Sequence, residues 1–354
     1  MDKPSINILV GVVCIVVNTK YFTYITTIIA IISIISAVYV YTYYQEQIAD
    51  MRTTISGLQN DVANLQSELY KYRNLTLVDD RGYVLNLTSY PNRIVSLAPS
   101  NTEILFAVGA GDKVVGVTDY CNYPYNFSAW IEAGNLTSVG DYWTPNIEAI
   151  IALEPDLVLA AFAQEEVVNT LRGMGYKVSV LDPDNIDDIL KDIVLVGRAT
   201  DRNVEAAILV NNLRRRIDAV VSKVADAAST PKVYYEVWYD PLWSVGSESW
   251  EHELIEKAGG INIFADQSIK YFETSSEAII ERNPDIMIFP LGHGGGPPFW
   301  GSFEQVKARP GWNAISAVQN DKLYKIDADI INRAGPRIVD ALETLAEIIH
   351  PELF

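Results

Sequence analysis

The chain shows three different patterns of apolar and polar residues. The first pattern is a long run without charged residues. Residues 21–45 carry no charged side chain and are rich in Ile. A helix of this length extends about 36 Å, enough to cross a bilayer. Tyrosines gather at both ends, lysines precede the run and acidic residues follow it. The pattern predicts an N-terminal membrane anchor over residues 1–45, single-pass, with the C-terminal part of the chain extracellular.

A cleaved signal peptide is the alternative interpretation of this run. The run is long for the hydrophobic region of such a peptide, and no small-x-small cleavage site follows it. Val13 does not match the small residue expected before a lipidated cysteine at Cys14. Residues 1–19 contain a further apolar stretch, which is too short to span a bilayer alone and leaves open whether a second membrane element precedes the anchor.

The second pattern is a heptad repeat over residues 46–74. Its two apolar positions are occupied by Ile48, Ile55, Val62 and Leu69 and by Met51, Leu58, Leu65 and Tyr72. Mostly β-branched residues at one position and two Leu at the other favour a parallel two-stranded coiled coil. We therefore predict a coiled-coil stalk that forms a homodimer. A single amphipathic helix lying on the main domain is the alternative.

From residue 75 onward, short apolar runs of strand length alternate with amphipathic segments of helix length. This alternation predicts an α/β fold with mostly parallel sheets. We expect an N-terminal lobe over residues 75–183, a connecting helix over 184–230 and a C-terminal lobe over 231–354. The connecting segment is almost free of Gly and Pro, which predicts a stiff link and a small opening motion. Ser100–Glu103 and Thr274–Glu277 have the capping-box pattern of a helix start.

An internal repeat supports two lobes. The segment Glu148–Leu159 recurs as Glu277–Ile288, with six identities in twelve positions. Each copy has the pattern of a short helix, a Pro-Asp turn and a buried strand. Two copies of one unit favour a two-lobed protein that binds a ligand in the cleft between the lobes.

Composition excludes several function classes. The net charge of −18 argues against nucleic acid as a partner. Two cysteines and three widely spaced histidines offer no metal site, and no nucleophile–base set is evident. The chain is thus not expected to be an enzyme or to hold a cofactor. Four glycosylation sequons follow the anchor, at Asn74, Asn86, Asn126 and Asn135.

Residues 93–124, RIVSLAPSNTEILFAVGAGDKVVGVTDYCNYP, carry a family resemblance. Together with 254–264, the repeat, 309–314 and 333–338, they resemble the cobalamin and iron-siderophore substrate-binding proteins of ABC importers, most closely the cobalamin branch. The resemblance covers about residues 76–354. It implies two α/β lobes joined by a long helix, and delivery of a metal chelate to a permease and its ATPase.

The resemblance also implies site residues. The expected ligand contacts are Tyr120, Tyr142, Trp143, Phe162, Trp238, Trp243, Asp329 and Arg333. Glu148 and Glu277 match carboxylates that dock onto the permease, one in each lobe. Ordinary packing for the aromatics, helix capping for the glutamates and a surface ion pair for Asp329 and Arg333 are the alternatives. His293, in a glycine-rich loop, is a weaker candidate for contact with a metal in the ligand.

These observations favour a membrane-anchored extracellular protein that captures cobalamin for an ABC importer. Aromatic side chains give large, rigid contact area that suits a planar ring system. An iron-siderophore or haem binding protein of the same family is the first alternative. A ligand-binding surface sensor or structural surface protein without transport is the second.

Overall fold

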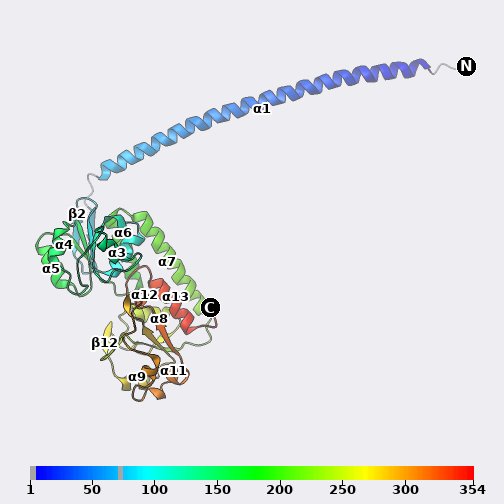
Figure 1. Cartoon of the computed structure of the whole chain (residues 1–354). Coiled ribbons are helices and arrows are strands. Elements are labelled where there is room, and N and C mark those ends of the chain that lie inside the picture. Colours follow the sequence, from blue (N-terminus) through cyan, green and yellow to red (C-terminus); the bar gives the residue numbers. More distant parts are fainter. Residues whose placement is uncertain (1–4, 71–74) are drawn as a thin grey trace. The chain divides into compact units, whose positions relative to one another are not determined.

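The computed structural model describes residues 5–70 and 75–354. Helix α1 spans Ser5–Tyr70 as one continuous helix (Figure 1). Its portion Tyr21–Val62 is long and apolar enough to cross a membrane, two properties that an N-terminal signal sequence shares. The heptad side chains that are described, from Ile48 to Val62, are exposed in the single chain. The segments predicted as anchor and stalk therefore lie on one helix, and both roles, with pairing through the stalk, stay predictions.

The remaining described residues, 75–354, lie within a second compact unit. Its first part opens with an antiparallel hairpin of β1 (Leu75–Val78) and β2 (Val84–Leu87). A five-stranded sheet of order β5-β4-β3-β6-β7 follows, and all of its pairs are parallel. Its strands are β3 (Ile94–Ser96), β4 (Val114–Val117), β5 (Thr137–Ser138), β6 (Leu157–Ala161) and β7 (Val178–Leu181). The helices of this N-terminal lobe are α2 (Pro99–Ala107), α3 (Phe127–Glu132), α4 (Ile147–Ala152) and α5 (Glu165–Gly173).

The C-terminal lobe holds a four-stranded parallel sheet of order β11-β8-β13-β14 and a small antiparallel sheet of order β12-β10-β9. The parallel strands are β8 (Lys232–Tyr235), β11 (Ile261–Asn262), β13 (Ile286–Pro290) and β14 (Leu323–Ile326), and the antiparallel strands are β9 (Trp238–Tyr239), β10 (Leu242–Val245) and β12 (Tyr271–Glu273). The helices are α8 (Trp250–Lys257), α9 (Ser276–Arg282), α10 (Phe303–Lys307), α11 (Ser316–Gln319), α12 (Ala328–Ile331) and α13 (Ile338–Ile349). The α/β fold with parallel sheets is thus confirmed.

The two repeat copies have the predicted local structure. Helix α4 leads into β6, and α9 leads into β13. Every residue of β6 and β13 is buried, as expected for parallel strands covered on both faces. The repeat therefore places one equivalent helix–strand unit in each lobe.

Both predicted capping boxes are wrong. Helix α2 begins at Pro99, because proline's fixed φ suits the first helical position, and Ala98 precedes it as a cap without a side-chain hydrogen bond. Glu103 is instead buried and paired with arginines of the other lobe. Helix α9 is capped by Ser275, whose Oγ accepts from the backbone N–H of Ala278 at 3.2 Å, one residue after the predicted Thr274.

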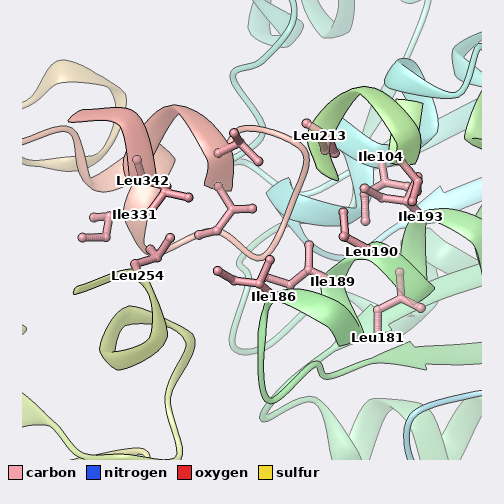
Figure 2. Close-up of a cluster of buried hydrophobic side chains, with 14 of the residues drawn as sticks. Ile104, Leu181, Ile186, Ile189, Leu190, Ile193, Leu213, Leu254, Ile331 and Leu342 are labelled. Atoms are coloured by element: carbon pink, nitrogen blue, oxygen red, sulfur yellow. The ribbon is translucent and has the colours of Figure 1, made fainter. Parts of the chain in front are cut away.

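The lobes are joined by two consecutive helices and by one hydrophobic core. Helix α6 spans Ile186–Thr200 and α7 spans Asn203–Val224, with Asp201 in the left-handed region at φ 62° between them. Helix α7 runs along both lobes (Figure 1). Buried residues of one cluster come from both lobes and both helices (Figure 2), among them Ile104, Leu190, Leu213, Leu254 and Leu342. A shared core of this kind resists wide separation of the lobes, in line with the predicted stiff link.

Candidate ligand-binding site

A pocket with a cavity volume of about 430 Å³ lies between the two lobes. Aromatic rings from both lobes dominate its wall. They are Tyr120, Tyr142, Trp143 and Phe162 from the N-terminal lobe and Trp250 and Tyr271 from the C-terminal lobe. The volume and the mainly apolar lining are those of a small-molecule site.

The N-terminal aromatics are placed by the ends of parallel strands. Tyr120 follows β4, and Phe162 comes directly after β6, at the sheet edge where α/β proteins bind ligands. The hydroxyl of Tyr142 donates to the backbone oxygen of Phe162 at 3.1 Å. Trp143 packs edge-on against Tyr142 with ring centroids 5.0 Å apart, and it remains 60% exposed. Four of the predicted contact residues therefore do lie in one wall.

A buried glutamine that the sequence did not single out holds this wall together. The side-chain amide of Gln164 donates to the backbone oxygens of Leu97 at 2.8 Å and Tyr142 at 2.7 Å. Its oxygen accepts from the backbone N–H of Ala161 at 2.9 Å. Burial raises the pKa of Tyr142 to about 12, so its phenol is neutral and available to hydrogen bond.

The opposite wall was not predicted. Trp250, at the start of α8, donates from its indole nitrogen to the backbone oxygen of Ile331 at 3.0 Å. Its ring meets that of Tyr271 edge-on, with centroids 6.3 Å apart. The Tyr271 hydroxyl donates to Glu251 Oε1 at 3.0 Å. Glu251 lines the pocket but is only 1% exposed, and burial raises its pKa to about 7.

A network of charged and polar side chains connects the two lobes beside the pocket. Arg333, which lines the pocket, pairs with Glu103 at 3.0 Å and with Asp329 at 2.7 Å. It also donates to Asn122 Oδ1 at 2.7 Å. Arg337 adds a second pair to Glu103 at 2.6 Å. Arg333 and Asp329 are thus members of a buried inter-lobe network rather than an isolated surface pair.

Asp329 does not itself line the pocket, and its direct contact with a ligand stays a prediction. Its carboxylate accepts from the side chain of Asn122 and the backbone N–H of Gly294, and bonds to His293 Nδ1 at 2.8 Å. Burial alone would raise the pKa of Asp329, but these hydrogen bonds and the charge of Arg333 hold that pKa well below its ordinary value. Its role in the structure is to orient His293, which does line the pocket.

Trp238 and Trp243 also do not line the pocket, and their contact with a ligand stays a prediction. Strand β8 ends at Tyr235, and the chain then turns into the β9–β10 hairpin. There Trp238 pairs with Trp243 and packs against Phe299 with ring centroids 5.1 Å apart. Val237 and Tyr271 occupy the pocket wall instead.

Glu148 and Glu277 are exposed residues in the first turns of α4 and α9. Asn146 and Ser275 cap these helices, so the glutamates themselves are not the caps. Hydrogen bonds from its own backbone N–H and from Ser275 lower the pKa of Glu277. Both carboxylates are therefore available for a partner, and the repeat puts them at equivalent places in the two lobes.

Two further predictions concern the surface and metals. Asn86, Asn126 and Asn135 are exposed, as glycosylation requires, while Asn74 lies outside the described residues. Among the side chains that the structure describes, no group of three or more His, Cys, Asp or Glu is arranged to hold a metal ion.

Comparisons with known proteins agree with this geometry. A family model described as periplasmic binding protein matches residues 94–330. The chain is 32% identical over 288 residues to an uncharacterized ABC transporter substrate-binding lipoprotein, YvrC, of Bacillus subtilis, covering 79% of this chain and 87% of the relative. It is 31% identical to a vitamin B12-binding protein of Vibrio cholerae, covering 71% of this chain and 86% of the relative. Among solved structures, a periplasmic haem-binding protein, RhuT, of Roseiflexus is similar with a TM-score of 0.65 and 26% identity, covering 74% of this chain and 99% of that one.

Proposed function

Because the chain belongs to the periplasmic binding protein family, we propose that it captures a corrinoid such as cobalamin outside the cell and delivers it to an ABC importer. The observation that carries the proposal is the aromatic pocket between the lobes. Rings from opposite walls, such as Tyr142 and Tyr271, offer flat apolar contacts to a planar macrocycle. The 31% identity to a vitamin B12-binding protein supports the corrinoid.

Proteins of this family bind substrates for transport and carry them as ligands, not as cofactors for catalysis. In this chain, Glu148 and Glu277 would meet cationic side chains of the permease. One exposed carboxylate per lobe gives two charged contacts at once, which favours one docking orientation. The ATPase on the other side of the membrane would supply the free energy of import.

Helix α1 would tether the protein to the membrane through residues 21–45. Its B. subtilis relative is a lipoprotein, so attachment to the membrane surface has a precedent in that protein. The exposed heptad residues of α1, such as Ile55 and Leu58, support a parallel homodimer, because pairing would cover them.

A haem or iron-siderophore ligand is the second candidate. The similarity to the Roseiflexus haem-binding protein supports it, and so does His293, whose ring is oriented by Asp329 at the pocket. A carboxylate on Nδ1 is the arrangement that metal-binding histidines usually have. A surface sensor or structural protein without transport would use the same pocket, but Glu148 and Glu277 would have no permease to bind.

Titration calorimetry of the full chain in nanodiscs tests the ligand. Cyanocobalamin, a ferric hydroxamate siderophore and haemin are compared, with empty nanodiscs as the blank. Loss of one stacked ring in Tyr271→Ala is expected to weaken cobalamin binding by roughly 30-fold, the equivalent of about 2 kcal/mol. The matched control Trp238→Ala, an exposed ring outside the pocket, is expected to leave affinity within about twofold. Binding of haemin or the siderophore alone would reject the corrinoid.

Uptake of labelled cobalamin by cells that carry the importer tests delivery. The double variant Glu148→Lys, Glu277→Lys is expected to bind cobalamin normally and to lose uptake, because like charges would then face each other at the permease. Unchanged uptake would remove the docking assignment. Binding without any uptake by the unaltered protein would support the sensor alternative.

A further inference from the structure

Most of the charged side chains that line the pocket form ion pairs with oppositely charged residues, but one does not. Lys270 lies 2.5 Å from Asp184 and 3.9 Å from Asp182. Asp182 is in turn paired with Arg81 at 2.9 Å. The two other basic residues of the lining, Arg333 and His293, both contact Asp329. Every basic side chain in the described lining therefore already has a carboxylate partner.

Glu251 is the exception. It has no ion-pair partner within 4 Å among the described residues, although its side chain lines the pocket and is almost fully buried. The charge of Lys270 acts on it from a greater distance. Its neighbour is the Tyr271 hydroxyl, which donates to both carboxyl oxygens at 3.0 and 3.3 Å. The Ser249 side chain and the backbone N–H of Glu251 itself also donate to this carboxyl group. A carboxyl group has about four lone-pair positions, so some acceptor capacity remains for a ligand. The tyrosine oxygen is also free to accept a further hydrogen bond.

We infer that the Glu251–Tyr271 pair makes this pocket select ring ligands that carry amides at their edge and reject ligands that carry carboxylates. A ligand amide N–H can donate to the acceptor capacity that remains on Glu251, and a hydrogen bond to a charged group is stronger than one between neutral groups. A ligand carboxylate finds no unpaired cation in the lining and meets Glu251 as a second acceptor. Like charges in a poorly hydrated site repel strongly.

The inference rests on the proposed function and names the ligand class for that same pocket. The side chains around a corrin ring end mostly in amides, whereas haem carries two propionates. Glu251 thus provides a reason, independent of sequence similarity, for the corrinoid over haem. It also makes Glu251 a specificity-determining residue outside the aromatic wall.

The test uses two ligands with the same ring. Dicyanocobinamide carries amides at positions where dicyanocobyrinic acid carries carboxylates. Titrations use the full chain in nanodiscs at pH 8, where Glu251 is ionised, in 0.3 M salt to screen the protein's overall negative charge. We expect the unaltered protein to bind the amide ligand at least 100-fold more tightly. Glu251→Gln, which can both donate and accept, is expected to reduce that ratio at least tenfold.

Glu273→Gln is the matched control, because it removes the same charge from an exposed position two residues after Tyr271. It is expected to leave the ratio unchanged within twofold. Equal affinity for both ligands, or an equal effect of Glu273→Gln and Glu251→Gln, would overturn the inference. Equal affinity of the unaltered protein for both ligands overturns the inference even where a variant fails to fold.

The proposed function can fail separately. When neither corrin binds but haemin does, the corrinoid proposal is wrong, and the comparison moves to haemin and its dimethyl ester. If the ester binds more tightly than haemin, and Glu251→Gln reduces that difference in affinity, the result would still support selection against carboxylates. Tighter binding of the diacid would overturn it, and so would failure of all four ligands to bind.

Discussion

Asp192 is a buried acid whose removal is expected to stabilise the protein. It lies on α6 and is only 1% exposed, and no N–H or O–H donor in the described residues reaches either carboxyl oxygen. Its neighbour is the Asp80 carboxyl, so a hydrogen bond between the two requires a shared proton. Burial, and then the charge of Asp80, raise the pKa of Asp192 from 3.8 to about 9. In Asp192→Asn an amide donor replaces that proton without adding charge.

The pKa fixes both the size and the direction of the effect. Between about pH 4 and pH 9 the folded protein holds a proton at Asp192 that the unfolded chain has released. Stability therefore falls as pH rises through this window, by about 1.4 kcal/mol per pH unit at most. At pH 7 the limit is about 4 kcal/mol. Local relaxation reduces this, so we expect Asp192→Asn to gain about 2 kcal/mol, or roughly 5 °C in Tm.

Thermal unfolding followed by tryptophan fluorescence measures this gain. All seven tryptophans lie between Trp130 and Trp312, so the signal reports on the two lobes and not on α1. The Tm advantage of Asp192→Asn is expected to be near zero at pH 4 and to widen steadily to pH 9. Asp218→Asn, an exposed position on α7, is the control for lost charge. An advantage that does not change with pH, or that Asp218→Asn shares, would refute the reasoning.

Other changes test the packing of the lobes by the same unfolding assay. Gly259→Ala is expected to lower the free energy of unfolding by about 1–3 kcal/mol, because Gly259 has φ +82° and an added Cβ would lie 2.6 Å from His350 Nε2. An unchanged stability would contradict this close approach. Arg309→Met is expected to cost about 3–5 kcal/mol, because Glu236 is only 1% exposed and loses two hydrogen bonds from Arg309. Glu236 would then be a buried charge without a cation, with the Tyr234 hydroxyl as its remaining donor. That cost is expected to shrink at low pH, where Glu236 is protonated, and a pH-independent cost would argue against it.

The sequence predicted elements that are determined by neighbouring residues. It missed contacts between residues that lie far apart in the chain. The apolar runs at Leu157–Ala161 and Ile286–Pro290 had to be buried strands, because few other structures cover every side chain of such a run. Glu103 was misread as part of a cap, since the pattern of a helix start is visible locally whereas Arg333 lies 230 residues away.

The candidate site also contains residues that the sequence predicted and residues that it missed. Tyr120, Tyr142, Trp143 and Phe162 follow strand ends or a loop that the family resemblance made identifiable. Tyr271 belongs to a three-residue strand of a small antiparallel sheet, and no periodic pattern of that length indicates which side chain faces a pocket. Trp238 and Trp243 were expected at the ligand because of the family resemblance, whereas in the structure they pair with each other in the β9–β10 hairpin and do not line the pocket.

The core shared by both lobes has a consequence for transport kinetics. The predicted small opening motion means that little free energy is diverted into a conformational change on binding, so we expect the measured affinity to stay near the intrinsic affinity of the pocket. The same stiffness means that empty and loaded protein offer Glu148 and Glu277 to the permease in nearly the same arrangement. In the proposed function, empty protein therefore competes with loaded protein for docking. Overproduction of the protein at scarce ligand is then expected to slow uptake, not to speed it.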